Sequence, residues 1–138
     1  MDLKLIAKPN RFLYVLIAGD LAVLALVTVA GFATHQTLGT AGFRLLTTFV
    51  PLTVAWGLVG VPLGVFDIQR VRDRRQWWRP FWGMALAAPW LGLLRAWLSG
   101  APTITVAFVV VVGGVAALAL LIWRLLFTLF MAPRFAGG

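Results

Sequence analysis

The sequence contains no cysteine, one histidine and only four acidic residues among its 138 positions. Without cysteine there can be no disulfide, no thiolate nucleophile and no cysteine-based metal site. The serine Ser99 and the threonines have no base at a readable spacing, and His35 has no neighbouring acid. These absences predict a protein that is not an enzyme and that holds no metal or other cofactor.

Charge is also scarce, since 12% of the residues are charged and 62% are apolar. An average soluble domain has about 25% charged and about 45–50% apolar residues. A soluble chain of this length could not bury so much apolar surface, whereas a lipid bilayer would solvate it. The composition therefore predicts a single membrane domain over residues 1–138.

Four apolar runs are long enough to cross a bilayer as helices, which need about 20 residues each. They cover residues 12–32, 45–66, 81–98 and 104–130. The fourth run begins with many β-branched residues, but a spanning strand would require a closed barrel, so we expect a helix. The fold class predicted is all-α, a polytopic membrane protein with a bundle of four transmembrane helices.

The stretch DIQRVRDRRQWWR, residues 67–79, separates the first two runs from the last two. We interpret it as a basic cytoplasmic loop, because cytoplasmic loops are rich in arginine and lysine. The basic residues on this side of the runs are Lys4, Lys8, Arg11, Arg70, Arg72, Arg74, Arg75, Arg79 and Arg134, whereas Arg44 lies on the other side. This asymmetry predicts that the N and C termini are both cytoplasmic.

The net charge of +8 indicates anionic partners. Because the basic residues flank apolar runs, anionic headgroups of the lipid bilayer explain this charge better than nucleic acid does. An acidic face of a partner protein is the alternative. The residues expected to make either contact are Arg70, Arg72, Arg74, Arg75, Arg79, Trp77 and Trp78.

Three ionisable residues, Asp20, Arg95 and Arg124, lie inside the apolar runs. Each costs about 3 kcal/mol on insertion scales, so each needs a partner or a wet cavity. At 1.5 Å per residue, Asp20 lies about 13 Å, Arg124 about 9 Å and Arg95 about 22 Å from the inner ends of their helices. We therefore expect Asp20 and Arg124 to form an ion pair, while Arg95 extends to the outer headgroups or reaches towards Asp20. The pair either holds the helices in register or forms a proton or anion site.

Small residues recur at four-residue spacing and predict close helix packing. They are Gly60, Gly64, Ala88, Gly92, Ala96, Gly113 and Ala117. Among the aromatic residues, Trp56, Trp90 and Trp123 are the candidates for an interior role, either in packing or beside an apolar cofactor. Packing is the commoner role of such side chains.

Four stretches together resemble domain-of-unknown-function family 3054. They are AGDLAVLALVTVAGF, PLTVAWGLVGVPLGVF, APWLGLLRAWLSGAP and LLIWRLLF, and the resemblance runs from about Arg11 to Phe130. It implies a small four-span prokaryotic membrane protein with no assigned activity, in the cytoplasmic (inner) membrane. The family's Gly-Asp and Trp-Arg pairs match Gly19, Asp20, Trp123 and Arg124, and Arg95 matches a further arginine.

Two functions follow as hypotheses. The first is a non-enzymatic structural or accessory component that packs against itself, as a homo-oligomer, or against a larger membrane complex. The alternative is a small proton- or ion-coupled transporter that uses Asp20 as its titrating group.

Overall fold

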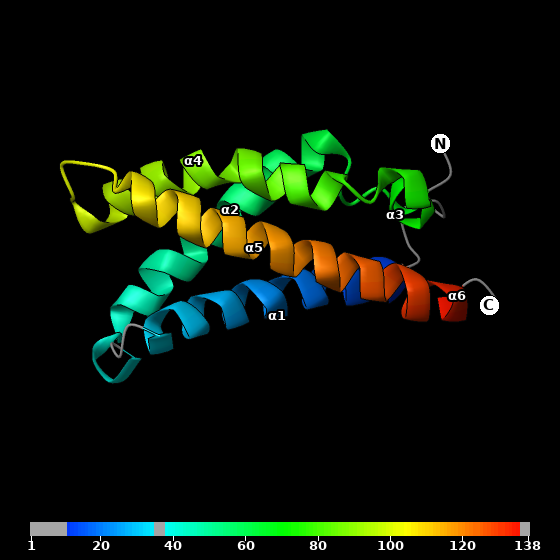
Figure 1. Cartoon of the computed structure of the whole chain (residues 1–138), viewed down its shortest axis with the longest axis horizontal. Helices are drawn as coiled ribbons and strands as arrows, with labels where there is room; N and C mark the ends of the chain where they lie inside the picture. The colour runs from blue at the N-terminus through cyan, green and yellow to red at the C-terminus, as the bar shows by residue number, and fades with distance from the viewer. Residues whose placement is uncertain (1–10, 35–37, 136–138) are drawn as a thin grey trace, which may run out of the picture.

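The computed structural model describes residues 11–34 and 38–135, and it confirms the all-α prediction. The long helices pack together as a bundle (Figure 1). They are α1 (Arg11–Thr34), α2 (Phe43–Leu63), α4 (Arg79–Ser99) and α5 (Val106–Leu126). The short helix α3 (Ile68–Arg72) and 3-10 turns at Leu38–Thr40 and Arg74–Gln76 lie in the connections.

Helix α5 continues without a break beyond its expected end. A π-helical turn, Phe127–Met131, leads into the short helix α6 (Ala132–Phe135). Inside this turn the Oγ1 of Thr128 donates a hydrogen bond of 2.7 Å to the carbonyl of Arg124. Short π-helical segments within α-helices are frequent at functional sites, which draws attention to Arg124.

Within residues 11–34 and 38–135, three helical segments are long and apolar enough to cross a membrane. They are α1, α2 and the continuous helix Val106–Arg134, and the chain is therefore treated as a membrane protein. Helix α4 has as many residues as α2, but its tryptophans and Arg95 make it less apolar. The third of the four expected spans is thus present as a helix, and its crossing of the membrane remains a prediction.

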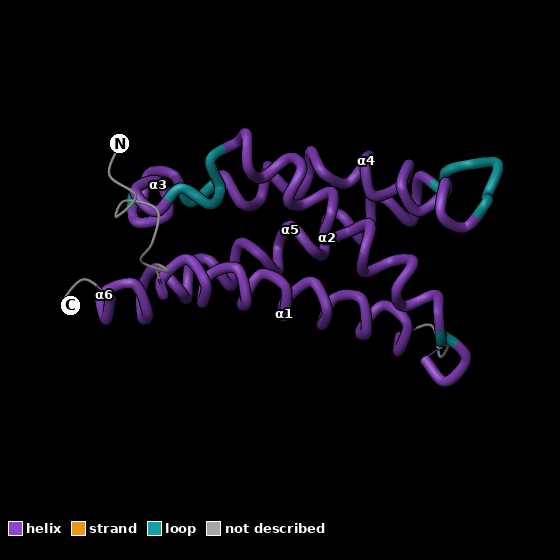
Figure 2. Tube along the Cα trace, turned by 180° about the vertical axis from the view of Figure 1, so that it is seen from behind, coloured by secondary structure: helices purple, strands orange, loops and turns teal. Residues whose placement is uncertain are grey.

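Neighbouring long helices pack in a closed order, with α2 against α4, α4 against α5, α5 against α1 and α1 against α2. Seen from behind, α2 starts beside the end of α1 and crosses obliquely towards α4 (Figure 2). The start of α1, helix α3 and helix α6 lie at one end of the bundle. We call this the basic end, because it carries Arg11, Arg70, Arg72, Arg74, Arg75, Arg79 and Arg134.

The second helix ends three residues earlier than its apolar run. Gly64 follows it with a φ of 72°, in the left-handed region that favours glycine. The N–H of Gly64 bonds to the carbonyl of Val61 at 3.1 Å, and that of Val65 bonds to Gly60 at 3.0 Å, which is a Schellman motif. Gly64, which was predicted to belong to a helix-packing face, therefore lies directly after α2 and terminates it.

Small residues bring α4 and α5 close together. A Cβ atom on Gly113 would lie 2.5 Å from the Cβ of Ala88, and one on Gly92 would lie 2.6 Å from a methyl carbon of Val109. Gly60 and Ala117 are buried as well, while Ala96 is partly exposed. The core between the helices contains Leu24, Leu52, Ala55, Trp56, Met84, Ala87, Leu91, Ala116 and Leu120.

Candidate functional site

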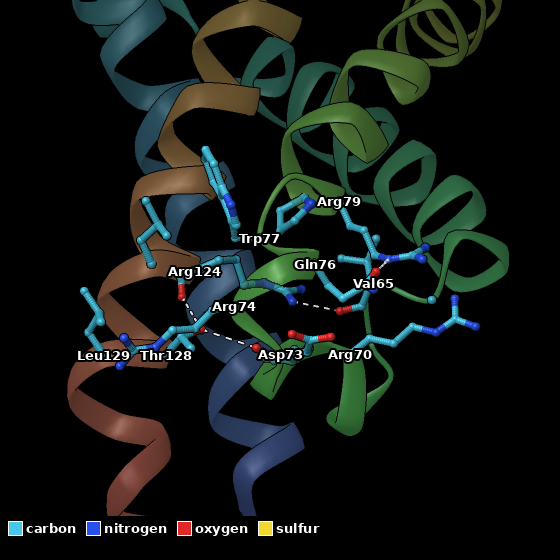
Figure 3. Close-up of a pocket in the computed structure, with 14 residues that line it drawn as sticks. Val65, Arg70, Asp73, Arg74, Gln76, Trp77, Arg79, Arg124, Thr128 and Leu129 are labelled. Atoms are coloured by element: carbon cyan, nitrogen blue, oxygen red, sulfur yellow. Dashed lines mark hydrogen bonds between the residues drawn. The ribbon is translucent and has the colours of Figure 1, made fainter.

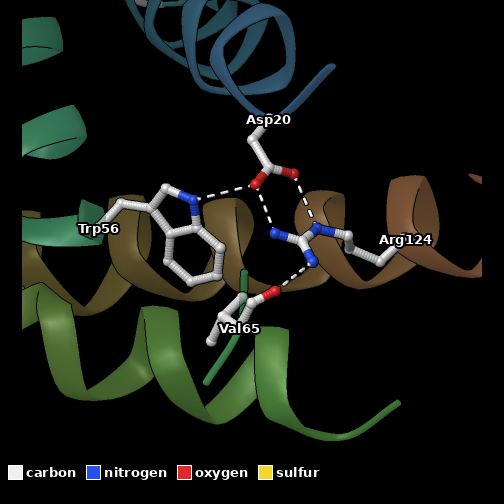
Figure 4. Close-up of polar contacts among 4 residues, drawn as sticks. All are labelled: Asp20, Trp56, Val65 and Arg124. Atoms are coloured by element: carbon white, nitrogen blue, oxygen red, sulfur yellow. Dashed lines mark hydrogen bonds and ion pairs between the residues drawn. The ribbon is translucent and has the colours of Figure 1, made fainter. Parts of the chain in front are cut away.

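The structure brings Asp20 of α1 and Arg124 of α5 together inside the bundle (Figure 4). The Nε of Arg124 donates a hydrogen bond of 2.9 Å to Oδ1 of Asp20, and its Nη2 donates one of 2.5 Å to Oδ2. The exposed fractions of the two side chains are 5% for Arg124 and 1% for Asp20. This is a two-bond, charge-assisted pair of the kind that gives both energy and directional specificity.

Two further groups complete the polar contacts of this pair. The indole Nε1 of Trp56, on α2, donates to Oδ2 of Asp20 at 3.2 Å. The Nη1 of Arg124 donates to the carbonyl of Val65 at 2.8 Å, just beyond the end of α2. We call these four residues the Asp20 cluster. It links α1, α2 and α5 with the segment that leaves α2.

The charges of the Asp20 cluster are well compensated. The carboxylate accepts three hydrogen bonds, and the guanidinium uses three of its five N–H bonds to donate. The guanidinium carbon also lies 5.6 Å from the ring centroid of Phe66 and 5.9 Å from that of Trp56. A buried ion pair needs such additional bonds to offset the loss of hydration of its two charges.

The residues next to the pair explain how α1 and α5 approach closely enough to form it. A Cβ atom on Gly19 would overlap the indole ring of Trp123, so only glycine leaves room for that ring. The Nε1 of Trp123 is buried and finds no hydrogen-bond partner among the described residues. The adjacent pairs Gly19-Asp20 and Trp123-Arg124 therefore act together: the first residue of each pair supplies the close contact, and the second supplies the charge.

Arg95 does not join the Asp20 cluster. It lies near the end of α4, away from the basic end, and its guanidinium carbon is 4.1 Å from the ring centroid of Phe108 on α5. Its Nε is buried without a hydrogen-bond partner in the described part of the chain. The structure thus places Arg95 with an aromatic ring rather than with the acid.

The basic segment between α2 and α4 is folded locally by its two aspartates. Asp67 accepts a hydrogen bond of 3.0 Å from the N–H of Gln69 at the start of α3. Asp73 accepts one of 2.9 Å from the N–H of Arg75 at the next turn. Such capping uses the aspartates and leaves the side chains that were predicted to contact lipid exposed. The exposed side chains are those of Arg70, Arg72, Arg74, Arg75, Trp77 and Trp78, and the side chain of Arg79 is partly buried.

Arg79 has a structural contact that its sequence position does not reveal. Its Nη1 donates a hydrogen bond of 2.7 Å to the carbonyl of Leu63, the last residue of α2, and its Nε donates to Gln76. Arg124 does the same for Val65, two residues later. Two arginines thus satisfy carbonyls at the negative end of the α2 dipole.

A cavity of about 390 Å³ opens beside these contacts at the basic end (Figure 3). We call it the basic-end cavity. It lies between α5 with its π-helical turn and the segment that runs from the end of α2 to the start of α4. Its lining residues are Gly64, Val65, Arg70, Val71, Asp73, Arg74, Gln76, Trp77, Arg79, Pro80, Arg124, Leu125, Thr128 and Leu129.

The remaining sequence candidates have different surroundings. Trp56 lies in the interior, as part of the Asp20 cluster, and Trp123 is half-buried, whereas Trp90 is 48% exposed on α4. His35 lies outside the described residues. Residues 11–34 and 38–135 contain no group of three or more side chains suited to holding a metal ion.

Comparisons with curated proteins and with solved structures found no match. A family model does match, over residues 17–127, and its description is "Protein of unknown function (DUF3054)". The match includes most of α1, the whole of α2, α4 and α5, and all four residues of the Asp20 cluster. The chain therefore belongs to the DUF3054 family of proteins of unknown function.

Proposed function

We propose that this protein is a non-enzymatic structural or accessory component of the cytoplasmic membrane of a prokaryote, packing against itself or against a larger membrane complex. All four long helices cross the bilayer, and the basic end faces the cytoplasm. In this proposal the hydrogen bonds and the ion pair of the Asp20 cluster hold α1, α2 and α5 in one register.

The observation that carries the proposal is the closure of the Asp20 cluster. A transported ion must exchange its protein ligands for water, yet the side chains of Asp20 and Arg124 are only 1% and 5% exposed. Both oxygens of the carboxylate already accept hydrogen bonds from protein groups. Such a pair favours register and specificity, the best supported use of buried polar groups.

The packing of α4 supports a fourth crossing. Helix α4 has 21 residues, as α2 has, and it packs against both α2 and α5, which are apolar enough to span. A helix held between two spanning helices shares their depth in the bilayer. The arginines of the basic end support the orientation, since they lie where a cytoplasmic face is expected.

An exposed face of α4 supports assembly with another protein. Trp82, Leu86, Trp90, Leu93 and Trp97 follow one another at intervals of three or four residues and are all about half exposed or more. Tryptophan normally gathers at the membrane interfaces, but Trp90 lies near the middle of α4. An aromatic side chain at that depth offers a large contact area to a neighbouring helix.

Native mass spectrometry of the protein extracted from its own membranes tests this proposal. We expect an oligomer or a retained partner, and we expect Trp90→Ala to weaken the assembly. The matched control is Trp82→Ala, at the interfacial end of the same face. A lone monomer for the unchanged protein, or equal assembly for both variants, would contradict the proposal.

Two hydroxyl groups of α2 are the observation that favours the transport alternative. The Oγ1 atoms of Thr48 and Thr53 are buried and find no partner among the described residues, and Thr53 is one turn from Trp56. Water beside them would give Asp20 a polar route. Proton flux into vesicles separates the two functions, because Asp20→Asn would abolish a transport flux, whereas the structural function predicts no flux before or after the change.

A further inference from the structure

We propose that the basic-end cavity binds the headgroup of an anionic phospholipid, with one acyl chain lying along α5. This adds a specific lipid site to the structural function, and it does not depend on whether the protein assembles with a partner. The occupant is recognised by two properties, a single negative charge and an attached hydrocarbon chain.

The charges around the cavity favour one anionic group. Four arginines line it, and they are Arg70, Arg74, Arg79 and Arg124. Three aspartates lie within or beside this set: Asp20 pairs with Arg124, Asp67 lies 3.6 Å from Arg70, and Asp73 lines the cavity. The balance leaves an excess of one positive charge, which matches the one negative charge of a phosphate diester.

Arg74 and Arg79 remain once Arg124 and Arg70 are paired, and Asp73 reduces their two charges to that excess of one. Arg79 donates its hydrogen bonds to neutral groups, the carbonyl of Leu63 and the side chain of Gln76. Arg74 is exposed and makes no hydrogen bond or ion pair within the described part of the chain. Arginine presents several N–H donors in a planar fork that suits phosphate oxygens, so Arg74 is free to take up a phosphate.

Six apolar side chains in the lining favour a lipid over free phosphate. Val65, Val71, Trp77, Pro80, Leu125 and Leu129 all contribute to the wall. A phosphate ion alone would gain nothing from these side chains, whereas the glycerol and upper acyl carbons of a lipid would bury them. The cavity volume, about 390 Å³, also lies within the range of about 300–1,000 Å³ that is usual for small-molecule sites.

An exposed stripe on α5 and the π-helical turn that follows it continues from the cavity and would receive the acyl chain. Its side chains are Leu118, Ile122, Leu125 and Leu129, with exposed fractions of 54%, 57%, 37% and 48%. Their spacing places them on one face of the helix. The eleven steps from Leu118 to Leu129, at a rise of 1.5 Å each, give a stripe about 16 Å long. One leaflet is half of a hydrocarbon core of about 30 Å, so the length of the stripe is close to the thickness of one leaflet.

Occupation of the site would act on the Asp20 cluster through the shared wall. Arg124 and Thr128 line the cavity (Figure 3). The same Arg124 bonds to Asp20 and to the carbonyl of Val65 (Figure 4). A lipid whose headgroup binds Arg74 and Arg79 and whose acyl chain lies along α5 would tie the basic segment to α5. The lipid would therefore stabilise the bundle at its basic end.

Native mass spectrometry of the purified full-length protein in detergent tests the site. The probes are a mono-anionic phosphatidylglycerol, a zwitterionic phosphatidylcholine and inorganic phosphate. Arg74→Gln is expected to weaken phosphatidylglycerol binding about fivefold, from about 1 kcal/mol per basic residue. The matched control is Arg75→Gln, which removes the same charge from the adjacent exposed residue outside the lining, and its effect should stay below about twofold.

A second pair of variants tests the apolar wall without changing charge. Leu129→Trp fills the cavity and should reduce phosphatidylglycerol binding, whereas Leu126→Trp, on an exposed residue outside the lining, should not. The proposal is overturned if Arg74→Gln and Arg75→Gln weaken binding equally, or if phosphatidylcholine binds as well as phosphatidylglycerol. Equal binding of inorganic phosphate, or no effect of Leu129→Trp, would overturn it as well.

Discussion

Removing the carboxylate of Asp20 while Arg124 remains is expected to destabilise the protein by about 3–5 kcal/mol, because it leaves a buried guanidinium without its counter-charge. In Asp20→Ala, Arg124 loses two hydrogen bonds, of 2.9 and 2.5 Å, at a side chain that is 5% exposed. The indole of Trp56 loses its acceptor at the same time. An ordinary hydrogen bond between membrane helices contributes about 0.6 kcal/mol. The expected loss of stability is several times larger than this contribution.

Replacing both partners by apolar residues should restore most of the lost stability. Substituting a buried ion pair by apolar residues of similar volume is often neutral or stabilising by about 1–4 kcal/mol. We therefore expect the double variant Asp20→Leu/Arg124→Met to be more stable than Asp20→Ala alone. The single variants Asp20→Leu and Arg124→Met, together with this double variant, complete the cycle that gives the coupling energy between the two positions.

The matched control for the buried pair is an exposed one. Asp67 lies 3.6 Å from Arg70, and both side chains are 47% exposed. Asp67→Asn removes the charge but keeps a good N-cap for α3, so its effect should be below about 1 kcal/mol. The assay is reversible unfolding in mixed detergent, followed by circular dichroism. A loss for Asp20→Ala no larger than that for Asp67→Asn, or a coupling energy near zero, would refute the reasoning.

Two pairs of glycines give further predictions about helix packing. Gly113→Ala should lower stability by about 1–3 kcal/mol, because the new methyl group would lie 2.5 Å from the Cβ of Ala88, whereas Gly114→Ala, with no atom within 4 Å, should leave it unchanged or slightly raised. Gly19→Ala should also be destabilising, since its Cβ would overlap the indole it faces on α5, and Gly31→Ala is its control in open space. Thermal unfolding measures all four, and equal effects within either pair would contradict the observed packing.

The pairing partners inside the membrane could be predicted because depth follows from residue count. A rise of 1.5 Å per residue places Asp20 and Arg124 within about 4 Å of each other in depth, and two opposite buried charges have few alternatives. Depth alone says nothing about rotation around the bundle axis. The roles of Trp56 and the carbonyl of Val65 therefore emerged only from the three-dimensional arrangement.

The second helix illustrates a limit of apolar runs. Hydropathy continues through Phe66, whereas α2 ends at Leu63, because the left-handed backbone of Gly64 closes the helix. A glycine within an apolar run is compatible with both a packing face and a helix end. Only the φ angle and the hydrogen bond from Val65 to Gly60 distinguish the two.

The basic-end cavity had no signal along the chain. Its lining comes from the end of α2, the basic segment and the end of α5, which are far apart in sequence. The arginines of the basic segment could be predicted as a charged surface, but their arrangement around a hollow depends on how α3 folds back towards α5. Arg79 likewise had a predicted lipid contact, while its bond to the carbonyl of Leu63 depends on tertiary structure.

Four membrane crossings with the basic end facing the cytoplasm are the central prediction, and cysteine labelling of whole cells measures them directly. Because the chain has no cysteine, single introduced thiols at Gly39, Arg75 and Ala101 are unique reporters, one in each connection between the long helices. We expect a membrane-impermeant thiol reagent to label positions 39 and 101 from outside and position 75 only after permeabilisation. Labelling of positions 75 and 101 from the same side would show that α4 does not cross, and would contradict the account.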